Sequence, residues 1–297
     1  MNYQINHQTI YNYSELASIS QNELFLFPRE TEKQKVIQST LNIFPKPQYT
    51  RQRVDYFGNI TQVFMVQHPH NELSITASSR VMTLVPETPV IAGTPPWESV
   101  VQRLGVHEHP EELDAYQYVF ISPQTAITSQ IKSYAQLSFP PGMSILAGAV
   151  NLTNRIFTEF SYDESATTVD TPVEQVLLNK KGVCQDFAHF AISCLRSLGM
   201  AARYVSGYLE TAPPPGKPKM VGADASHAWF ALFVPGTGWV DLDPTNNIMT
   251  GEQHITVAWG RDYTDVTPVK GVVMGGGSHS LSVKVDVSAD RQCSLEF

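Results

Sequence analysis

The sequence predicts an α+β protein in which an antiparallel, β-sandwich-like module precedes a module of mixed helices and strands. Residues 1–85 predict the first module, because apolar and polar side chains alternate there in short stretches separated by turn signals. The second module is predicted by apolar residues at helical spacing between 144 and 160 and again between 184 and 198. A hairpin pattern over residues 227–243 adds strands to these helices.

The length and composition are those of a folded protein with two domains. The chain has 297 residues, which suggests two domains at roughly 150 residues each. Hydrophobic residues make up 42% and charged residues only 16%, against ~25% charged in an average globular chain, which excludes a disordered or coiled-coil protein. The net charge of -8, without a basic cluster, argues against nucleic acid or an anionic membrane surface as the main partner.

The three cysteines, Cys184, Cys194 and Cys293, include no CxxC pair, so we expect neither a zinc ribbon nor a disulfide scaffold. The first residues lack the basic and apolar regions of a signal peptide. The longest apolar run, residues 145–150, is too short to cross a bilayer. We therefore expect a reduced, cytoplasmic protein with no membrane partner.

The first module is expected to span residues 1–90. Tyr3 and Ile5 alternate with polar neighbours, as residues do in a strand with one buried face. A segment rich in proline and glycine at 86–96 marks the linker. Residues 91–297 are assigned to the second module.

The second module is expected to begin with helices. Pro96 precedes Trp97 in the manner of a helix start, and Ser144 can cap a helix that runs to about Phe160. The tripeptide at 107–109 offers two histidines, but a proline follows directly and no third ligand is near. We therefore predict no metal site there.

Cys184 is predicted at the start of a helix that ends at Gly199. One face of this helix is formed by residues at spacings of three and four: Cys184, Phe187, Ala188, Ala191, Cys194, Leu195 and Leu198. Gly182 provides a flexible entry that places Cys184 in or just before the first turn. There the free backbone amides and the helix dipole favour a thiolate, the form that a cysteine nucleophile needs. Cys194 is expected to be packed and inert.

Residues 227–234 and 239–243 are predicted to form a hairpin, with His227 and Asp243 at the same end. If Val234 pairs with Gly238, His227 and Asp243 are diagonal neighbours on one face, roughly 7–8 Å apart between Cα atoms. A four-residue loop would place them on opposite faces. We predict the first register, because it alone allows a triad with Cys184 and it leaves the other face entirely apolar.

In this arrangement each of the three residues has one role. Cys184 attacks a carbonyl carbon as a thiolate, and His227 takes up its proton and later returns one to the leaving amine. Asp243 accepts a hydrogen bond from the second ring nitrogen and fixes the imidazole tautomer. Backbone amides at the helix start, that of Cys184 among them, would hold the oxyanion.

Three blocks resemble the core of the transglutaminase-like superfamily: Gly182-Val-Cys-Gln-Asp-Phe-Ala188, Ser226-His-Ala-Trp229 and Gly238-Trp-Val-Asp-Leu-Asp-Pro-Thr245. The segment from His254 to Gly277, and the turn at 55–59, are similar to bacterial members of cysteine-protease type that carry an amino-terminal β domain. The resemblance implies a papain-like catalytic domain with its core at about 144–250. It also implies that Cys184, His227 and Asp243 form the triad.

The resemblance and the triad predict a cysteine-dependent peptidase or amidase that acts on a peptide or protein amide. Protein-glutamine transamidation is the near alternative, and a non-catalytic peptide-binding module is the alternative of another class. A zinc hydrolase is disfavoured because HExxH is absent, and no cofactor or metal is expected. Tyr162, Gln185, Trp229 and the loop 211–225 are candidates to line a substrate cleft, although ordinary packing explains each of them as well.

Overall fold

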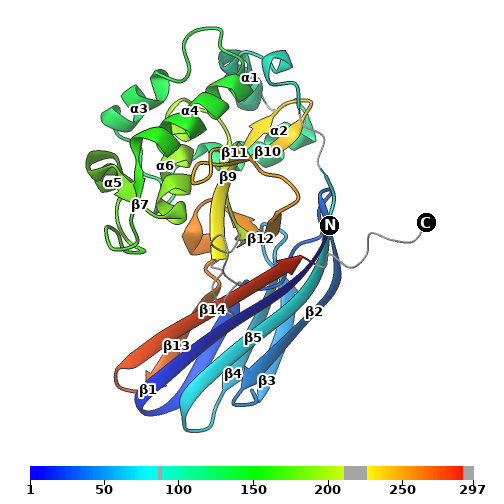
Figure 1. Ribbon diagram of the computed structural model, residues 1–297, viewed down its shortest axis with the longest axis vertical. Helices are drawn as coiled ribbons and strands as arrows, with labels where there is room; N and C mark the ends of the chain where they lie inside the picture. The colour runs from blue at the N-terminus through cyan, green and yellow to red at the C-terminus, as the bar shows by residue number, and fades with distance from the viewer. Residues whose placement is uncertain (86–88, 107, 211–225, 290–297) are drawn as a thin grey trace, which may run out of the picture.

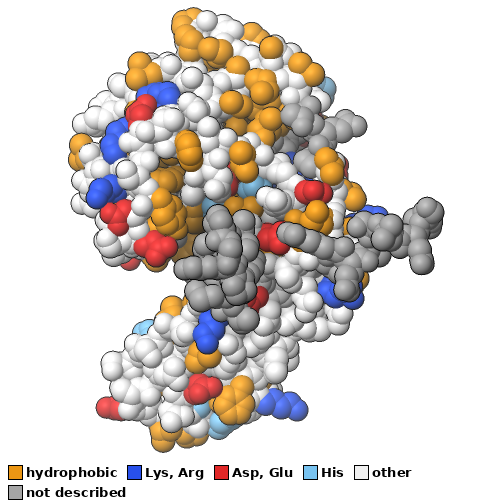
Figure 2. Space-filling model, viewed as in Figure 1, with side chains coloured by type: hydrophobic (Ala, Val, Ile, Leu, Met, Phe, Trp, Pro, Cys, Tyr) orange, Lys and Arg blue, Asp and Glu red, His pale blue; other side chains and the backbone are white. Residues whose placement is uncertain are grey.

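The computed structural model describes residues 1–85, 89–106, 108–210 and 226–289, and it consists of two lobes (Figure 1). One lobe is an antiparallel β-sheet, and the other carries all of the described helices around a second sheet. The predicted α+β class is therefore confirmed. On the face in Figure 2, acidic and basic side chains lie interspersed on the helical lobe.

The first lobe is built around one very long strand. Its amino-terminal strands are β1 (Asn2–Leu24), β2 (Gln34–Phe44), β3 (Tyr49–Val54), β4 (Ile60–Val66) and β5 (His70–Thr83). Their pairing follows the order β2-β5-β1-β4-β3, in which β5 pairs with residues 2–17 of β1 and β4 with residues 20–24, one after the other along the same edge. Alternate residues are buried at the start of β1, from Tyr3 to Thr9, as the sequence pattern predicts. The strands belong to one seven-stranded sheet that curls on itself.

The last two described strands return to this first sheet. Strands β13 (Val269–Gly275) and β14 (His279–Ala289) both pair antiparallel with β1, on the edge that β4 and β5 leave free. The sequence assigns these residues to the second module, 91–297, but they complete the sheet of the first lobe. A strand as long as β1 has two edges of backbone donors and acceptors. Strands β4 and β5 supply partners for one edge only, so the other edge needs β13 and β14.

The helices of the second lobe precede most of its strands. They are α1 (Trp97–Val106), α2 (Pro110–Tyr116), α3 (Ser129–Gln136), α4 (Ile145–Glu159), α5 (Val173–Asn179) and α6 (Cys184–Ser197), with short 3-10 turns η1 (Ile91–Gly93), η2 (Gln117–Val119) and η3 (Tyr263–Asp265). Helix α1 begins directly after Pro96, and the Ser144 hydroxyl accepts from the Ala147 amide at the start of α4. Both predicted helix starts are confirmed.

The second sheet has five antiparallel strands in the order β11-β10-β9-β8-β12. These are β8 (Ala202–Leu209), β9 (Ser226–Val234), β10 (Gly238–Asp243), β11 (Ile248–Met249) and β12 (His254–Gly260). Two short parallel strands, β6 (Ser161–Tyr162) and β7 (Lys181–Gly182), lie beside the start of α6. Helix α6 packs against β8 and β9 and is buried all round from Asp186 to Arg196. It is therefore the central helix of the lobe, with more than the one buried face that its sequence pattern predicts.

Candidate active site

Cys184 is the first residue of α6, where the sequence places it. It is half-buried. The chain that leads into α6 is held by Asp186, whose carboxylate accepts from the Val183 amide at 2.8 Å and from the Thr167 hydroxyl at 2.6 Å. This carboxylate lies where a side chain at position 182 would be, because a Cβ on Gly182 would fall 2.7 Å from its oxygen. Gly182 is therefore required by this close approach.

The predicted hairpin register is confirmed. Val234 pairs with Gly238, and the ladder continues to Phe230 and Leu242. The face that the parity argument assigns to the core is buried: Ala228, Phe230, Leu232, Val234, Val240 and Leu242. Burial of this face against α6 leaves His227 and Asp243 on the other one.

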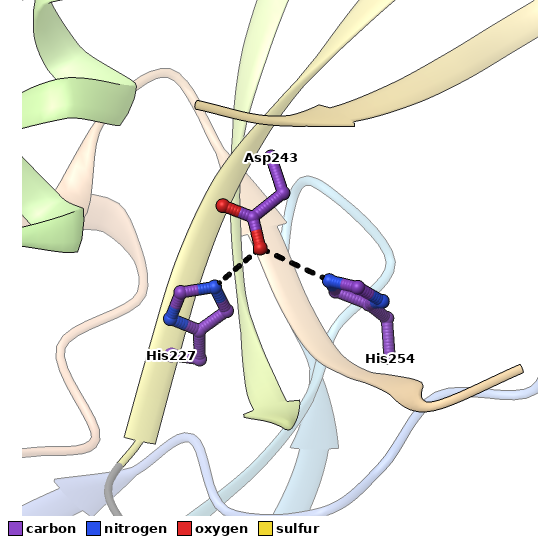
Figure 3. Close-up of side chains that lie close together, drawn as sticks. All are labelled: His227, Asp243 and His254. Atoms are coloured by element: carbon purple, nitrogen blue, oxygen red, sulfur yellow. Dashed lines mark hydrogen bonds and ion pairs between the residues drawn. The ribbon is translucent and has the colours of Figure 1, made fainter. Parts of the chain in front are cut away.

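Asp243 lies at the centre of a hydrogen-bond network (Figure 3). Its Oδ2 accepts from His227 Nε2 at 2.7 Å, from Asn246 Nδ2 at 2.7 Å and from His254 Nε2 at 3.1 Å. Its Oδ1 accepts from two backbone amides of the following turn. Asp243 is completely buried, and burial alone would raise the pKa of its carboxyl, but these donors outweigh it and hold the pKa well below the usual range.

His227 carries the strongest electrostatic signal of the site. Burial alone would lower the pKa of its imidazole, but hydrogen bonds with Asp243 and with the Cys184 side chain, and the negative charges of both, raise the pKa to about 10. The second ring nitrogen, Nδ1, points away from Asp243 (Figure 3). The structure therefore brings the three predicted residues together around one imidazole, which is 11% exposed.

His254 is a member of this network that the sequence analysis did not single out. It opens β12, and strands β9 and β8 separate it from Asp243 on β10. On β8, Gly207 pairs with His227, and the Trp229 ring that lies over this glycine contacts the ring of His254. A histidine at a strand start is no signal by itself, so only the strand order identifies it.

Among the described residues, His227, Asp243 and His254 are the group whose potential metal-ligand atoms lie within 4.8 Å of one another. These atoms are already joined by hydrogen bonds, with both Nε2 atoms directed at the same carboxylate oxygen. The arrangement thus serves to hold an ionised carboxylate between two imidazoles.

The candidates for a substrate cleft fall in different places. Tyr162 is 53% exposed, and partial burial of its hydroxyl together with the charge of Cys184 raises its pKa to about 12. Gln185 donates to the Val169 carbonyl at 3.2 Å. Trp229 is only 1% exposed and packs against the rings of His227 and His254, the ordinary packing that was its alternative role. Its indole NH must be satisfied in the interior, which Asp241 does at 3.1 Å.

The other sequence-based expectations have mixed outcomes. Cys194 is completely buried, and this burial raises the pKa of its thiol, as expected for an inert cysteine. The loop 211–225, His107 and Cys293 lie outside the described residues.

Comparison with known proteins identifies the family of the chain. Residues 3–82 match the model of the bacterial transglutaminase-like N-terminal region, and residues 138–244 match that of the transglutaminase-like superfamily. An uncharacterized protein of Mycobacterium tuberculosis is 39% identical over 295 residues, which are 97% of this chain and 91% of the relative. The chain belongs to the transglutaminase-like superfamily.

Relatives of this superfamily member include a further uncharacterized protein, from Mycobacterium leprae, at 34% identity over 95% of the chain and 96% of the relative. A protein-glutamine gamma-glutamyltransferase of Pseudomonas aeruginosa is 29% identical over 33% of the chain and 16% of its own length. The crystal structure of a "putative cysteine protease" from Cytophaga hutchinsonii shares the fold, with a TM-score of 0.75 at 18% identity, covering 100% of this chain and 92% of that one. Within the described residues, no helix has the length and apolar character needed to span a membrane.

Proposed function

We propose that this transglutaminase-like protein is a cysteine-dependent enzyme that hydrolyses amide or peptide bonds through a thioacyl intermediate. Cys184 is the nucleophile, His227 the general acid and base, and Asp243 the group that orients His227. The observation that carries this proposal is the position of His227, which hydrogen-bonds a thiol at the start of a buried helix and a buried carboxylate.

The proposed reaction has two halves. The Cys184 thiolate attacks the carbonyl carbon and forms a C–S bond, while protonated His227 holds the proton that left the thiol. Collapse of the tetrahedral intermediate breaks the C–N bond, and His227 gives this proton to the departing amine. Water then attacks the thioester, His227 takes a proton from it, and the broken C–S bond releases the acid and restores Cys184.

Transamidation is the second candidate, in which an amine replaces water in the second half. It is favoured by the local similarity to a protein-glutamine gamma-glutamyltransferase. Hydrolysis is favoured because amine transfer requires a site that excludes competing water, whereas Cys184 itself is only half-buried.

The thiolate–imidazolium pair is tested by alkylation with iodoacetamide, with each cysteine followed by mass spectrometry. Because protonated His227 stabilises the Cys184 anion, we expect Cys184 to react much faster than buried Cys194 at neutral pH, and His227→Ala to slow it by about tenfold. His279→Ala, a change at an exposed histidine of the first lobe, is the matched control. Equal reactivity of Cys184 and Cys194 would instead favour a non-catalytic peptide-binding module.

The reaction itself is tested with glutamine peptides and with peptide amides. Release of ammonia or of a peptide fragment by the wild-type protein, and its loss in Cys184→Ala, is the expected result. If adding a primary amine yields a peptide–amine conjugate in place of the free acid, the protein is a transamidase.

A further inference from the structure

A cavity of about 690 Å³ lies where the two lobes meet, apart from Cys184 and His227. The first lobe contributes residues 31–33 and the turn at 56–58, and the second contributes the end of α2, the turn η2 and strands β8, β10 and β12. Its walls are rich in aromatic rings, among them Tyr118, Trp239 and Trp259.

Arg203, on β8, lies between two of these rings. Its guanidinium carbon is 3.7 Å from the ring centre of Trp259 and 4.2 Å from that of Trp239. Trp259 comes from β12, on one side of β8, and Trp239 from β10, which lies beyond β9 on the other side. The β9 residue opposite Arg203 is Ala231, whose small side chain leaves the guanidinium and the Trp239 ring room to meet. The indoles therefore cover the guanidinium from both sides.

Only 8% of Arg203 is exposed, and its Nε is fully buried with no hydrogen-bond partner among the described residues. The guanidinium lines the cavity. The nearest acid that acts on it, Asp241, is already engaged by Lys33 at 2.7 Å and by the Trp229 indole. Burial lowers the pKa of Arg203 to about 10, which still leaves it charged at neutral pH.

Arg196 shows how the same fold satisfies a buried guanidinium. It is 2% exposed, and its donors reach the carbonyls of Tyr118, Ala202 and Arg261 and the hydroxyls of Ser122 and Thr125. A buried charge without such partners is costly unless a ligand supplies them. The contrast with Arg196 marks Arg203 as a group whose partner comes from outside the described chain.

We propose that this cavity binds a carboxylate ligand, anchored in bidentate fashion by Arg203. Because indoles cover the guanidinium from both sides, a ligand must approach along its edge, where two parallel N–H groups match the two oxygens of a planar carboxylate. The charged side chains that line the cavity are Arg203, Lys33, Glu32, Asp114 and Asp241, two positive and three negative. The three negative groups disfavour a phosphate dianion more strongly than a ligand with a single negative charge held at Arg203.

The remaining walls indicate what the ligand carries besides its carboxylate. The rings of Tyr56, Tyr118 and Trp239 offer apolar surface to a side chain, and the acidic groups can accept from an amide or amino group. We therefore assign the α-carboxylate of an amino acid or of a peptide carboxyl terminus with an aromatic or large apolar side chain.

The test measures quenching of tryptophan fluorescence and titration calorimetry with the full chain. The probes are free phenylalanine, acetyl-Gly-Phe with a free carboxylate, and acetyl-Gly-Phe amide. We expect saturable binding of at least one carboxylate, and at least tenfold weaker binding of the amide. The free amino acid and the peptide distinguish the two sources of the α-carboxylate. Binding of the amide as tight as that of the acid, no saturable binding of either acid, or competition by inorganic phosphate at equal strength would overturn the proposal.

Two arginine variants provide a second measurement. Arg203→Met is expected to lose carboxylate binding by at least tenfold while keeping or raising the melting temperature, because it removes a buried charge without partners. Arg196→Met is the matched control and is expected to lower the melting temperature strongly. Cys184→Ala is expected to bind the carboxylate as the wild type does, so a failure of the proposed catalysis leaves this site intact. If Arg203→Met lowers the melting temperature as much as Arg196→Met, the guanidinium serves the fold and the proposal fails.

Discussion

The carboxylate of Asp243 shows how a buried charge is held in this protein. Five hydrogen bonds converge on its two oxygens, and two of them come from the imidazoles of His227 and His254. Water does not reach the group, so these donors replace its hydration. Their loss would raise the pKa of the carboxyl towards and beyond its ordinary value, since burial then acts alone.

Replacement of His254 tests its role as a positioning residue. His254→Leu removes one donor to Asp243, and we expect amide turnover to fall by about tenfold, with the acid limb of the pH–rate profile displaced to higher pH. His254→Gln keeps an amide donor and is expected to restore part of the rate. An unchanged pH profile in His254→Leu, with only a lower melting temperature, would show that the residue serves packing alone.

One contribution to the pH dependence of stability comes from His7, which is buried in the first lobe. Burial lowers its pKa from 6.5 to about 4, and its Nδ1 hydrogen-bonds the Tyr208 hydroxyl at 2.8 Å. The unfolded chain binds a proton at higher pH than the folded one. Stability from this group is therefore present above pH 6.5 and is lost as the pH falls towards 4, on the order of 3 kcal/mol in all.

This loss is measured by urea unfolding at a series of pH values, with His7→Gln as the comparison. We expect the free energies of unfolding of the two proteins to converge between pH 6.5 and 4. The contribution of His227 to stability depends on pH in the opposite sense, because folding raises the pKa of this imidazole to about 10. This contribution is present below pH 6.5 and is lost as the pH rises through 10. Parallel curves for wild type and His7→Gln would contradict the assignment of a neutral buried imidazole.

At the scale of elements, the site depends on how closely β12, β8 and β9 approach. Gly207 on β8 lies opposite His227, and the Trp229 ring and the Ile255 carbonyl occupy the space where a side chain would stand. This ring in turn packs against the imidazoles of His227 and His254. One glycine therefore permits the packing of the indole beside both imidazoles.

We expect Gly207→Ala to destabilise the protein by about 1–3 kcal/mol or more, since the added methyl would fall 2.5 Å from the Trp229 ring and still closer to a backbone oxygen. Chemical denaturation measures the change. Gly251→Ala is the matched control, because nothing lies within 4 Å of the added carbon. Equal stability of the two variants would mean that β8 and β12 can move apart without cost.

At the scale of the whole molecule, the two ends of the chain complete one lobe. Residues Tyr3–Tyr13 of β1 pair with His279–Ala289 of β14, and the second lobe is the segment between them (Figure 1). The cavity around Arg203 is lined by both lobes, because residues 31–33 and the turn at 56–58 lie against the second sheet. The first lobe thus forms part of a potential binding surface.

Truncation tests this dependence on the chain end. A chain that stops at residue 268 lacks β13 and β14 and exposes one whole edge of β1, so we expect a lower melting temperature and aggregation. A chain that stops at residue 289 keeps both strands and serves as the control. Thermal melting and size-exclusion chromatography compare the two, and a soluble monomer of unchanged stability from the shorter chain would contradict the expectation.

The sequence by itself determined the local elements of this protein: the helix that begins at Cys184, the cap at Ser144 and the register that pairs Val234 with Gly238. Such features are predictable because periodicity, capping and parity act over a few residues. Only the tertiary structure decided that His254 reaches Asp243, that Trp229 is buried and that β14 pairs with β1. Those contacts depend on which strands become neighbours, and this order is set by the burial of whole faces, a property that no short stretch of sequence carries.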